Sequence, residues 1–141
     1  MKVTALKNHL SDSEILTLLS YSEYPCSRQK LINIAERYKS NPEIYAFGCE
    51  HLETVDGIII VKKHSLNHIE IKSISVSPDY RKEGIGSYLI SYIAGCNLHS
   101  KITAETDNDA VVFYRKNGFL VERLKEKYVG TPRYLCTLHL N

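Results

Sequence analysis

Apolar residues recur with a helical period most clearly between positions 85 and 96. They fall at i, i+3, i+4, i+7, i+8 and i+11, and they are Ile85, Tyr88, Leu89, Tyr92, Ile93 and Cys96. This spacing places all six on one face of an α-helix. The segment therefore predicts an amphipathic helix packed against a core.

Two further helices are predicted near the start of the chain. Ser11 and Glu14 have the spacing of a capping box, and apolar residues follow at helical spacing over 15–19. A second helix is expected to begin near Ser27 and to end at Asn41-Pro42, because the residue before a proline disfavours the helical conformation. Its apolar face consists of Leu31, Ile34, Ala35 and Tyr38.

Short apolar runs between turn residues predict strands. They cover 3–6, 44–49, 58–61, 68–76, 101–105, 120–128 and 134–140. Residues 55–57 are typical of a turn or bulge, and 65–67 of a turn. A short helix is expected over 110–117, with N-cap oxygens from residues 107–109, Gly118 at the C′ position, and Phe119 folded onto Tyr114. This order predicts a mixed α/β fold around one sheet.

Composition narrows the functional classes. A length of 141 residues and a hydrophobic fraction of 43% suit one domain, 1–141. A net charge of +2 from scattered basic residues gives no footprint for nucleic acid. No apolar run approaches the ~20 residues that span a membrane, and the first residues lack the apolar core of a signal peptide. We therefore expect a cytoplasmic protein with no membrane or nucleic-acid partner.

The cysteines and histidines give no sign of a metal site. Cys26, Cys49, Cys96 and Cys136 form no Cys-x-x-Cys pair, and free, mostly buried thiols in a reducing cytosol are expected. His64 and His68 are four residues apart, but no carboxylate or cysteine completes a ligand set with them. We expect no bound metal.

The segment Arg81-Lys82-Glu83-Gly84-Ile85-Gly86 joins a strand to the clearest helix. Glycines and a helix N-terminus expose backbone N–H groups, which together favour a phosphate. The third glycine of a Rossmann fingerprint is missing, and no lysine separates Gly86 from Ser87 as a Walker A loop requires. The loop predicts a phosphorylated ligand outside these two classes.

The stretch 74–86 closely resembles the acetyl-CoA site of the GNAT-type N-acetyltransferases, in which a strand, a Pro and Arg/Gln-x-x-Gly-x-Gly/Ala open a helix. A second segment, 107–119, is similar to the family's Asn…Ala…Phe-Tyr-x-Lys-x-Gly-Phe signature. The resemblance covers about 70–119. It implies a central, mostly antiparallel sheet of six to seven strands flanked by about four helices.

The resemblance also implies the residues of the site. The CoA pyrophosphate would contact the loop, and the pantetheine arm would pair with the strand before it. The expected cofactor-binding residues are Ile74, Ser75, Val76, Arg81, Lys82, Glu83, Gly84, Ile85, Gly86, Ser87, Asn108 and Tyr114. Asn108 serves equally well as a helix N-cap.

Acyl transfer from a thioester to an amine requires loss of the amine proton, stabilisation of an oxyanion and help for the departing thiolate. By resemblance, Tyr114 is the candidate general acid, although it could instead simply pack beneath Phe119 in the C-cap. The N–H of Val76 is the candidate oxyanion donor. Glu70 is the candidate general base, acting directly or through water, or else a solvated strand residue paired with Lys72.

The expected reaction is direct transfer of an acetyl group, in a ternary complex, to a primary amine of a small molecule or peptide. Tyr21, Tyr24, Tyr128 and Tyr134 could line the acceptor cleft or lie half-buried at the surface. The alternatives are a non-catalytic acyl-CoA-binding sensor or interaction domain, and an unrelated nucleotide-binding α/β domain. The resemblance also allows a homodimer, formed through the later strands.

Overall fold

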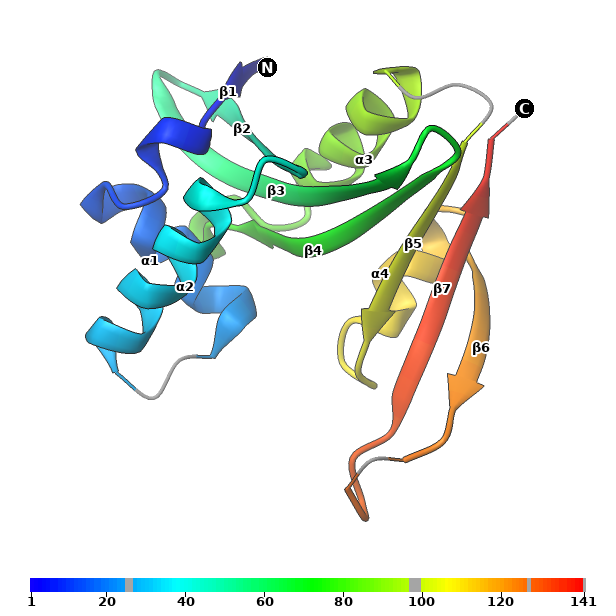
Figure 1. The fold of residues 1–141 in the computed structure, drawn as a ribbon. Coiled ribbons are helices and arrows are strands. Elements are labelled where there is room, and N and C mark those ends of the chain that lie inside the picture. Colours follow the sequence, from blue (N-terminus) through cyan, green and yellow to red (C-terminus); the bar gives the residue numbers. More distant parts are fainter. Residues whose placement is uncertain (25–26, 97–99, 127, 141) are drawn as a thin grey trace.

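A computed structural model describes residues 1–24, 27–96, 100–126 and 128–140. Their elements follow the predicted order (Figure 1). The strands are β1 (Lys2–Ala5), β2 (Ile44–His51), β3 (Thr54–Ser65), β4 (His68–Val76), β5 (Lys101–Thr106), β6 (Leu120–Leu124) and β7 (Arg133–His139). The helices are α1 (Ser13–Glu23), α2 (Arg28–Ser40), α3 (Ile85–Cys96) and α4 (Val111–Lys116), with short 3-10 helices at Lys7–His9 and Pro78–Tyr80.

The strands form one sheet in the order β1-β2-β3-β4-β5-β7-β6. Every neighbouring pair is antiparallel except β4 and β5, which are parallel. The predicted mostly antiparallel, mixed α/β fold is confirmed. Figure 1 shows the sheet as two arms that meet near one end of β4 and β5. The first arm contains β1, β2, β3 and β4, and the second contains β5, β7 and β6.

The contact between the two arms is short. β4 and β5 pair only from His68 with Lys101 to Ile71 with Ala104. Beyond that point β4 remains paired with β3 up to Val76, and β5 remains paired with β7 up to Thr106. The two parallel strands therefore diverge and leave a V-shaped opening in the sheet (Figure 1).

A β-bulge marks the point of divergence. Ile60 pairs with Ser73 and the next residue, Val61, pairs with Ile71, so Lys72 is an extra residue in β4. Because side chains alternate along a strand, one extra residue reverses the alternation. The alternation of β4 side chains between the two helix layers is therefore shifted by one residue after Lys72.

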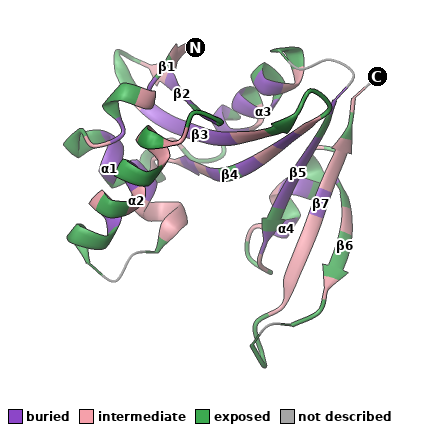
Figure 2. Cartoon of the chain, viewed as in Figure 1, coloured by how far each residue is buried: buried purple, intermediate pink, exposed green. Residues whose placement is uncertain are grey.

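Helices cover both faces of the first arm (Figure 2). α1 and α2 pack on one face over a core that includes Leu19, Leu31, Ile58 and Ile60. The core on the other face belongs to α3 and α4 and includes Leu89, Ile93, Ile59, Ile71, Ile102 and Tyr114. The sheet is thus the middle layer between two apolar cores.

Most predicted helix signals are confirmed, but two differ. In α3 the buried positions are Ile85, Gly86, Leu89, Ile90 and Ile93, whereas Tyr88 and Tyr92 are exposed. The capping box at Ser11 is wrong, because Asp12 is the N-cap of α1 and Ser11 Oγ donates to Glu36 Oε1 at 2.6 Å. The start of α2 beside Ser27 is as expected, and Ser27 Oγ caps the helix by accepting a hydrogen bond from Lys30 N.

Cys49 and Cys136 are buried free thiols, as expected, whereas Cys96 is exposed. Cys26 lies outside the described residues. Within the described segments, no helix combines the length and apolar character needed to cross a membrane.

Candidate active site

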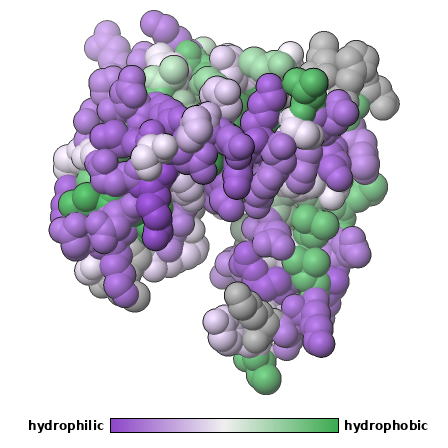
Figure 3. Space-filling model, viewed as in Figure 1, coloured by the Kyte–Doolittle hydropathy of each residue, from purple (hydrophilic) through white to green (hydrophobic). Residues whose placement is uncertain are grey.

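The opening between β4 and β5 leads into a cleft of about 630 Å³. Figure 3 shows the molecule hollowed between the α1–α2 side and the arm that contains β5 and β7. Ten of the predicted cofactor-binding residues line the cleft: Ile74, Ser75, Val76, Arg81, Lys82, Gly84, Ile85, Gly86, Ser87 and Tyr114. The two predicted segments, far apart in sequence, thus form one cavity.

The loop before α3 has the backbone of an anion cradle. Lys82 and Gly84 have φ values of 69° and 83°. Turns with such left-handed residues allow successive N–H groups to converge on an anion. The carbonyl of Gly84 accepts the first helical hydrogen bond, from Tyr88 N at 2.9 Å. The N–H groups that follow Gly84 lie in the first turn, where an α-helix offers unpaired donors and the positive end of its dipole.

The two glycines of the loop have different roles. A Cβ on Gly84 would meet no atom within 4 Å and would project into open space. A Cβ on Gly86 would lie 3.0 Å from ring atoms of Phe113 on α4. Gly84 thus permits the positive φ, and Gly86 permits the close approach of α3 to α4.

Arg81 joins the loop to two other elements. Its Nε donates to the carbonyl of Val76 at 3.2 Å, and its guanidinium carbon lies 5.6 Å from the ring centroid of Tyr21. The first contact fixes the loop to the end of β4, and the second fixes it to α1. Arg81 therefore orients the cradle while its charge stays at the cleft.

Tyr114 lies in the wall of the cleft. Its side chain is buried, and its ring makes edge contacts with Phe113 and Phe119 at centroid distances of 5.3 and 5.2 Å. The expected fold-back of Phe119 is confirmed. Burial raises the pKa of the Tyr114 hydroxyl, and Cys136 and Asp107 add to the effect. The hydroxyl therefore keeps its proton at neutral pH and is available to donate a hydrogen bond.

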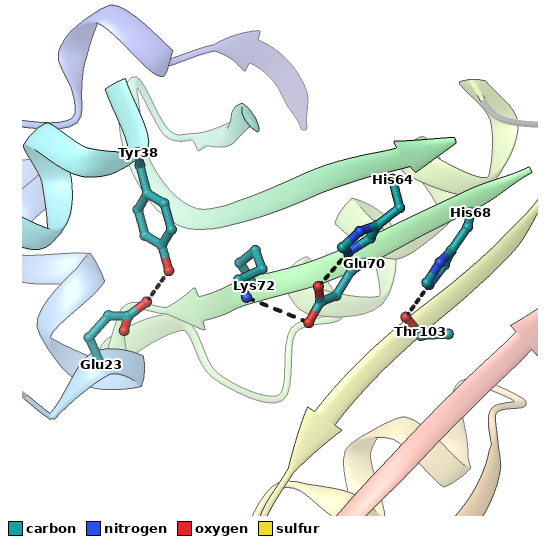
Figure 4. A network of polar contacts seen from close by, with 7 residues as sticks. All are labelled: Glu23, Tyr38, His64, His68, Glu70, Lys72 and Thr103. Atoms are coloured by element: carbon teal, nitrogen blue, oxygen red, sulfur yellow. Dashed lines mark hydrogen bonds and ion pairs between the residues drawn. The ribbon is translucent and has the colours of Figure 1, made fainter. Parts of the chain in front are cut away.

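Glu70 lies on β4 outside the lining of the cleft. Its Oε1 contacts His64 Nε2 at 2.7 Å and its Oε2 lies 3.6 Å from Lys72 Nζ (Figure 4). The predicted pair with Lys72 is present, and His64 is a partner that the sequence did not indicate. The ring of His64 also stacks on that of His68, with centroids 4.7 Å apart.

Glu83 and Asn108 are the predicted cofactor residues that do not line the cleft. Asn108 is exposed, and its Oδ1 accepts a hydrogen bond from Tyr134 Oη at 2.5 Å. The predicted capping is not found: the N-cap of α4 is Ala110, without a side-chain cap hydrogen bond, and Asp107 Oδ1 accepts from the N–H groups of Asp109 and Ala110 at 3.0 Å in the turn before the helix.

The sequence reasoning missed part of the lining. Phe113, Val112 and Lys116 on α4 and Asp107, Asp109 and Ala110 before it line the cleft, as does Tyr80. Tyr21 and Tyr24, which the sequence left open between cleft and surface, also line it. Helical spacing from Tyr114 could have identified some of the α4 residues. No local signal indicates that α1 reaches the cleft, since this depends on tertiary packing.

Comparison with known families places this chain in one class. The model of the acetyltransferase (GNAT) domain matches residues 42–121, which is more than half of the chain. The protein belongs to the GNAT acetyltransferase family, as the two motifs predicted. A comparison with curated protein sequences gives no match.

Solved structures agree on the fold. An aminoglycoside 6′-N-acetyltransferase complexed with coenzyme A has a TM-score of 0.75 at 19% identity. The aminoglycoside 6′-N-acetyltransferase from Enterococcus faecium gives 0.75 at 17%, and a GNAT family acetyltransferase from Elizabethkingia anophelis with acetyl-CoA bound gives 0.72 at 18%. Each alignment covers 99% of this chain and 97% of the other.

Proposed function

We propose that the protein is an acetyl-CoA-dependent N-acetyltransferase. It transfers the acetyl group from the CoA thioester directly to a primary amine of a small molecule or peptide, with both substrates bound together. The observation that carries this proposal is the cleft itself. It opens where β4 leaves β5, with the N-terminus of α3 and Tyr114 in its lining.

Two features of the lining support CoA as the ligand. N–H groups from Lys82 to Ser87 bind the pyrophosphate, aided by the α3 dipole. The free edge of β4 beyond Ile71 offers backbone groups from Ile74 to Val76 to the amide groups of the pantetheine arm. The open space in front of Gly84 leaves room for a phosphate beside the backbone.

Tyr114 and the free edge of β4 act on the charges that develop during transfer. A backbone N–H of β4 near its junction with β5, rather than that of the more distant Val76, donates to the carbonyl oxygen as the thioester carbon becomes tetrahedral. Tyr114 serves as the general acid, donating toward the sulfur as it leaves. Because its raised pKa holds the proton firmly, hydrogen bonding supplies much of the help that Tyr114 gives the thiolate.

Glu70 is the general base of this proposal, acting directly or through water. It lies on β4 beside the point where the strands diverge, and its carboxylate is held by His64 and Lys72. These partners orient the carboxylate toward the face of the sheet that α1 and α2 cover. The acceptor amine approaches from that side.

Two observations support an amine as the acceptor. The C-terminal end of α1, next to Tyr24, lies at the cleft, and this end of a helix favours a cation. The aminoglycoside 6′-N-acetyltransferases named above share the fold. Tyr21 and Tyr24 supply an aromatic wall against which an ammonium or its carbon chain packs.

Calorimetry and an acceptor screen test the proposal. CoA should bind, ATP and NAD should not, and free CoA thiol should appear when acetyl-CoA is mixed with an accepted amine. Binding of ATP or NAD without CoA would favour an unrelated nucleotide-binding domain. CoA binding without thiol release over a broad amine panel would favour an acyl-CoA sensor.

A further inference from the structure

Lys72 is placed unusually for a lysine on a strand. It is the extra residue of the β4 bulge, its side chain is 36% exposed, and its Nζ lies 3.6 Å from Glu70 Oε2. Figure 4 shows the ammonium and the carboxylate pointing toward one another along β4. An amine of the protein therefore already occupies a position beside the proposed general base.

Lys72 also lies at the apex of the opening. Pairing between β4 and β5 ends at Ile71, so Lys72 is the first β4 residue beyond the junction. The phosphate cradle lies past the other end of the strand, and the cleft lining includes Ile74 and Val76 between them. A strand rises about 3.3 Å per residue, so Val76 and Lys72 are about 13 Å apart.

This geometry determines where a bound thioester would lie. The pyrophosphate is held at the start of α3, and the pantetheine arm extends along β4 from Val76 past Ile74 toward the apex. The thioester at the end of the arm thus approaches Lys72. The lysine side chain is long and flexible enough to turn its Nζ from Glu70 toward this end of the cleft.

We infer that Lys72 is a self-acetylation site, modified within the same molecule by bound acetyl-CoA when no acceptor is present. This inference rests on the proposed function. Glu70 takes a proton from the Nζ ammonium, and the freed lone pair attacks the thioester carbon. The C–N bond forms, the C–S bond breaks, Nζ releases its second proton to solvent and Glu70 passes the proton it took to solvent. The sulfur takes a proton from Tyr114, which recovers one from solvent, and CoA leaves as the thiol.

Acetylation would change the acceptor side of the site. It removes the charge of Lys72 and with it the ion pair to Glu70 Oε2. An acceptor amine that binds beside Glu70 competes with Lys72 for the same thioester. A good acceptor should therefore protect Lys72, and a protein left with acetyl-CoA alone should become modified.

Mass spectrometry of the wild-type protein tests the inference without relying on any variant. The protein is incubated with acetyl-CoA and no amine, and the modified lysines are mapped by peptide. We expect one acetyl group, at Lys72, with a rate per molecule that is independent of protein concentration. Lys72→Arg should abolish it and Lys62→Arg should not, although Lys62 pairs with Glu70 across β3 and β4.

Glu70→Gln should slow the modification about 100-fold, which is the scale of a general base. Acetylation of Lys72 no faster than that of Lys62, or a per-molecule rate that rises with protein concentration, would overturn the inference. Calorimetry separates the two proposals. Acetyl-CoA binding with Lys72 unmodified defeats the self-acetylation alone, whereas no acetyl-CoA binding defeats the proposed function itself.

Discussion

Replacing Gly84 by valine tests the phosphate cradle most directly. Gly84 has a φ of 83°, which a β-branched residue adopts only at a cost of about 1–2 kcal/mol. Valine would drive the backbone toward negative φ and turn the peptide groups on both sides of residue 84. The N–H groups would then no longer converge on the pyrophosphate.

The size of the effect follows from the hydrogen bonds that are lost. One hydrogen bond to a charged group contributes about 1.5–3 kcal/mol, so losing one should weaken CoA binding roughly 10- to 150-fold. Calorimetric titration with CoA measures the affinity, and thermal melting measures the strain.

Gly130 provides a matched control for this substitution. Its φ is 81° and a Cβ there would also meet no atom within 4 Å, but it lies between β6 and β7, outside the cleft lining. Gly130→Val should lower stability by a similar amount and leave CoA affinity unchanged. Equal CoA affinities for the two variants would refute the cradle assignment.

Three further perturbations are informative. Tyr114→Phe should lower kcat about 100-fold with little change in KM for acetyl-CoA, measured by thiol release; full turnover would remove the acid role. Gly86→Ala should lower the free energy of unfolding by about 1 kcal/mol, measured by chemical denaturation, because its Cβ crowds Phe113. Gly95→Ala is the control: a Cβ there meets nothing within 4 Å, so this substitution should stabilise α3. Effects of equal sign in the two variants would contradict this reasoning. Burial, together with the charges of His64 and Lys101, lowers the pKa of His68 in the folded protein. The unfolded chain therefore binds more protons at this residue, so the melting temperature should decrease as the pH is lowered through about 6.5. His68→Gln should flatten that part of the pH profile, and an unchanged slope would refute the linkage.

Local signals predicted the elements that bound the cleft. The helical series over 85–96 and the apolar run over 68–76 have the same limits as α3 and β4. Gly118 has the predicted positive φ, and Phe119 N donates to the carbonyl of Tyr114. In each case the cause lies within a few residues of the chain, where sequence reasoning is strongest.

The predictions that were wrong concern side chains whose partners lie far away in the sequence. The sequence alone allows Ser11 to cap α1, but its hydroxyl instead donates a hydrogen bond to Glu36 on α2. Asn108 could have capped α4, but Tyr134 on β7 binds its side chain. The bulge at Lys72 arises from the pairing of β4 with β3, so the alternation along 68–76 alone does not reveal it.

The short parallel junction between β4 and β5 also bears on how the chain folds. The antiparallel pairs β2–β3 and β3–β4 join neighbouring segments, so each closes only a short loop. The pairing of His68 with Lys101 must instead bring together segments separated by the whole of α3, and such contacts form slowly. We therefore expect the apex of the cleft to form late in folding, and cofactor affinity to appear only once it has formed.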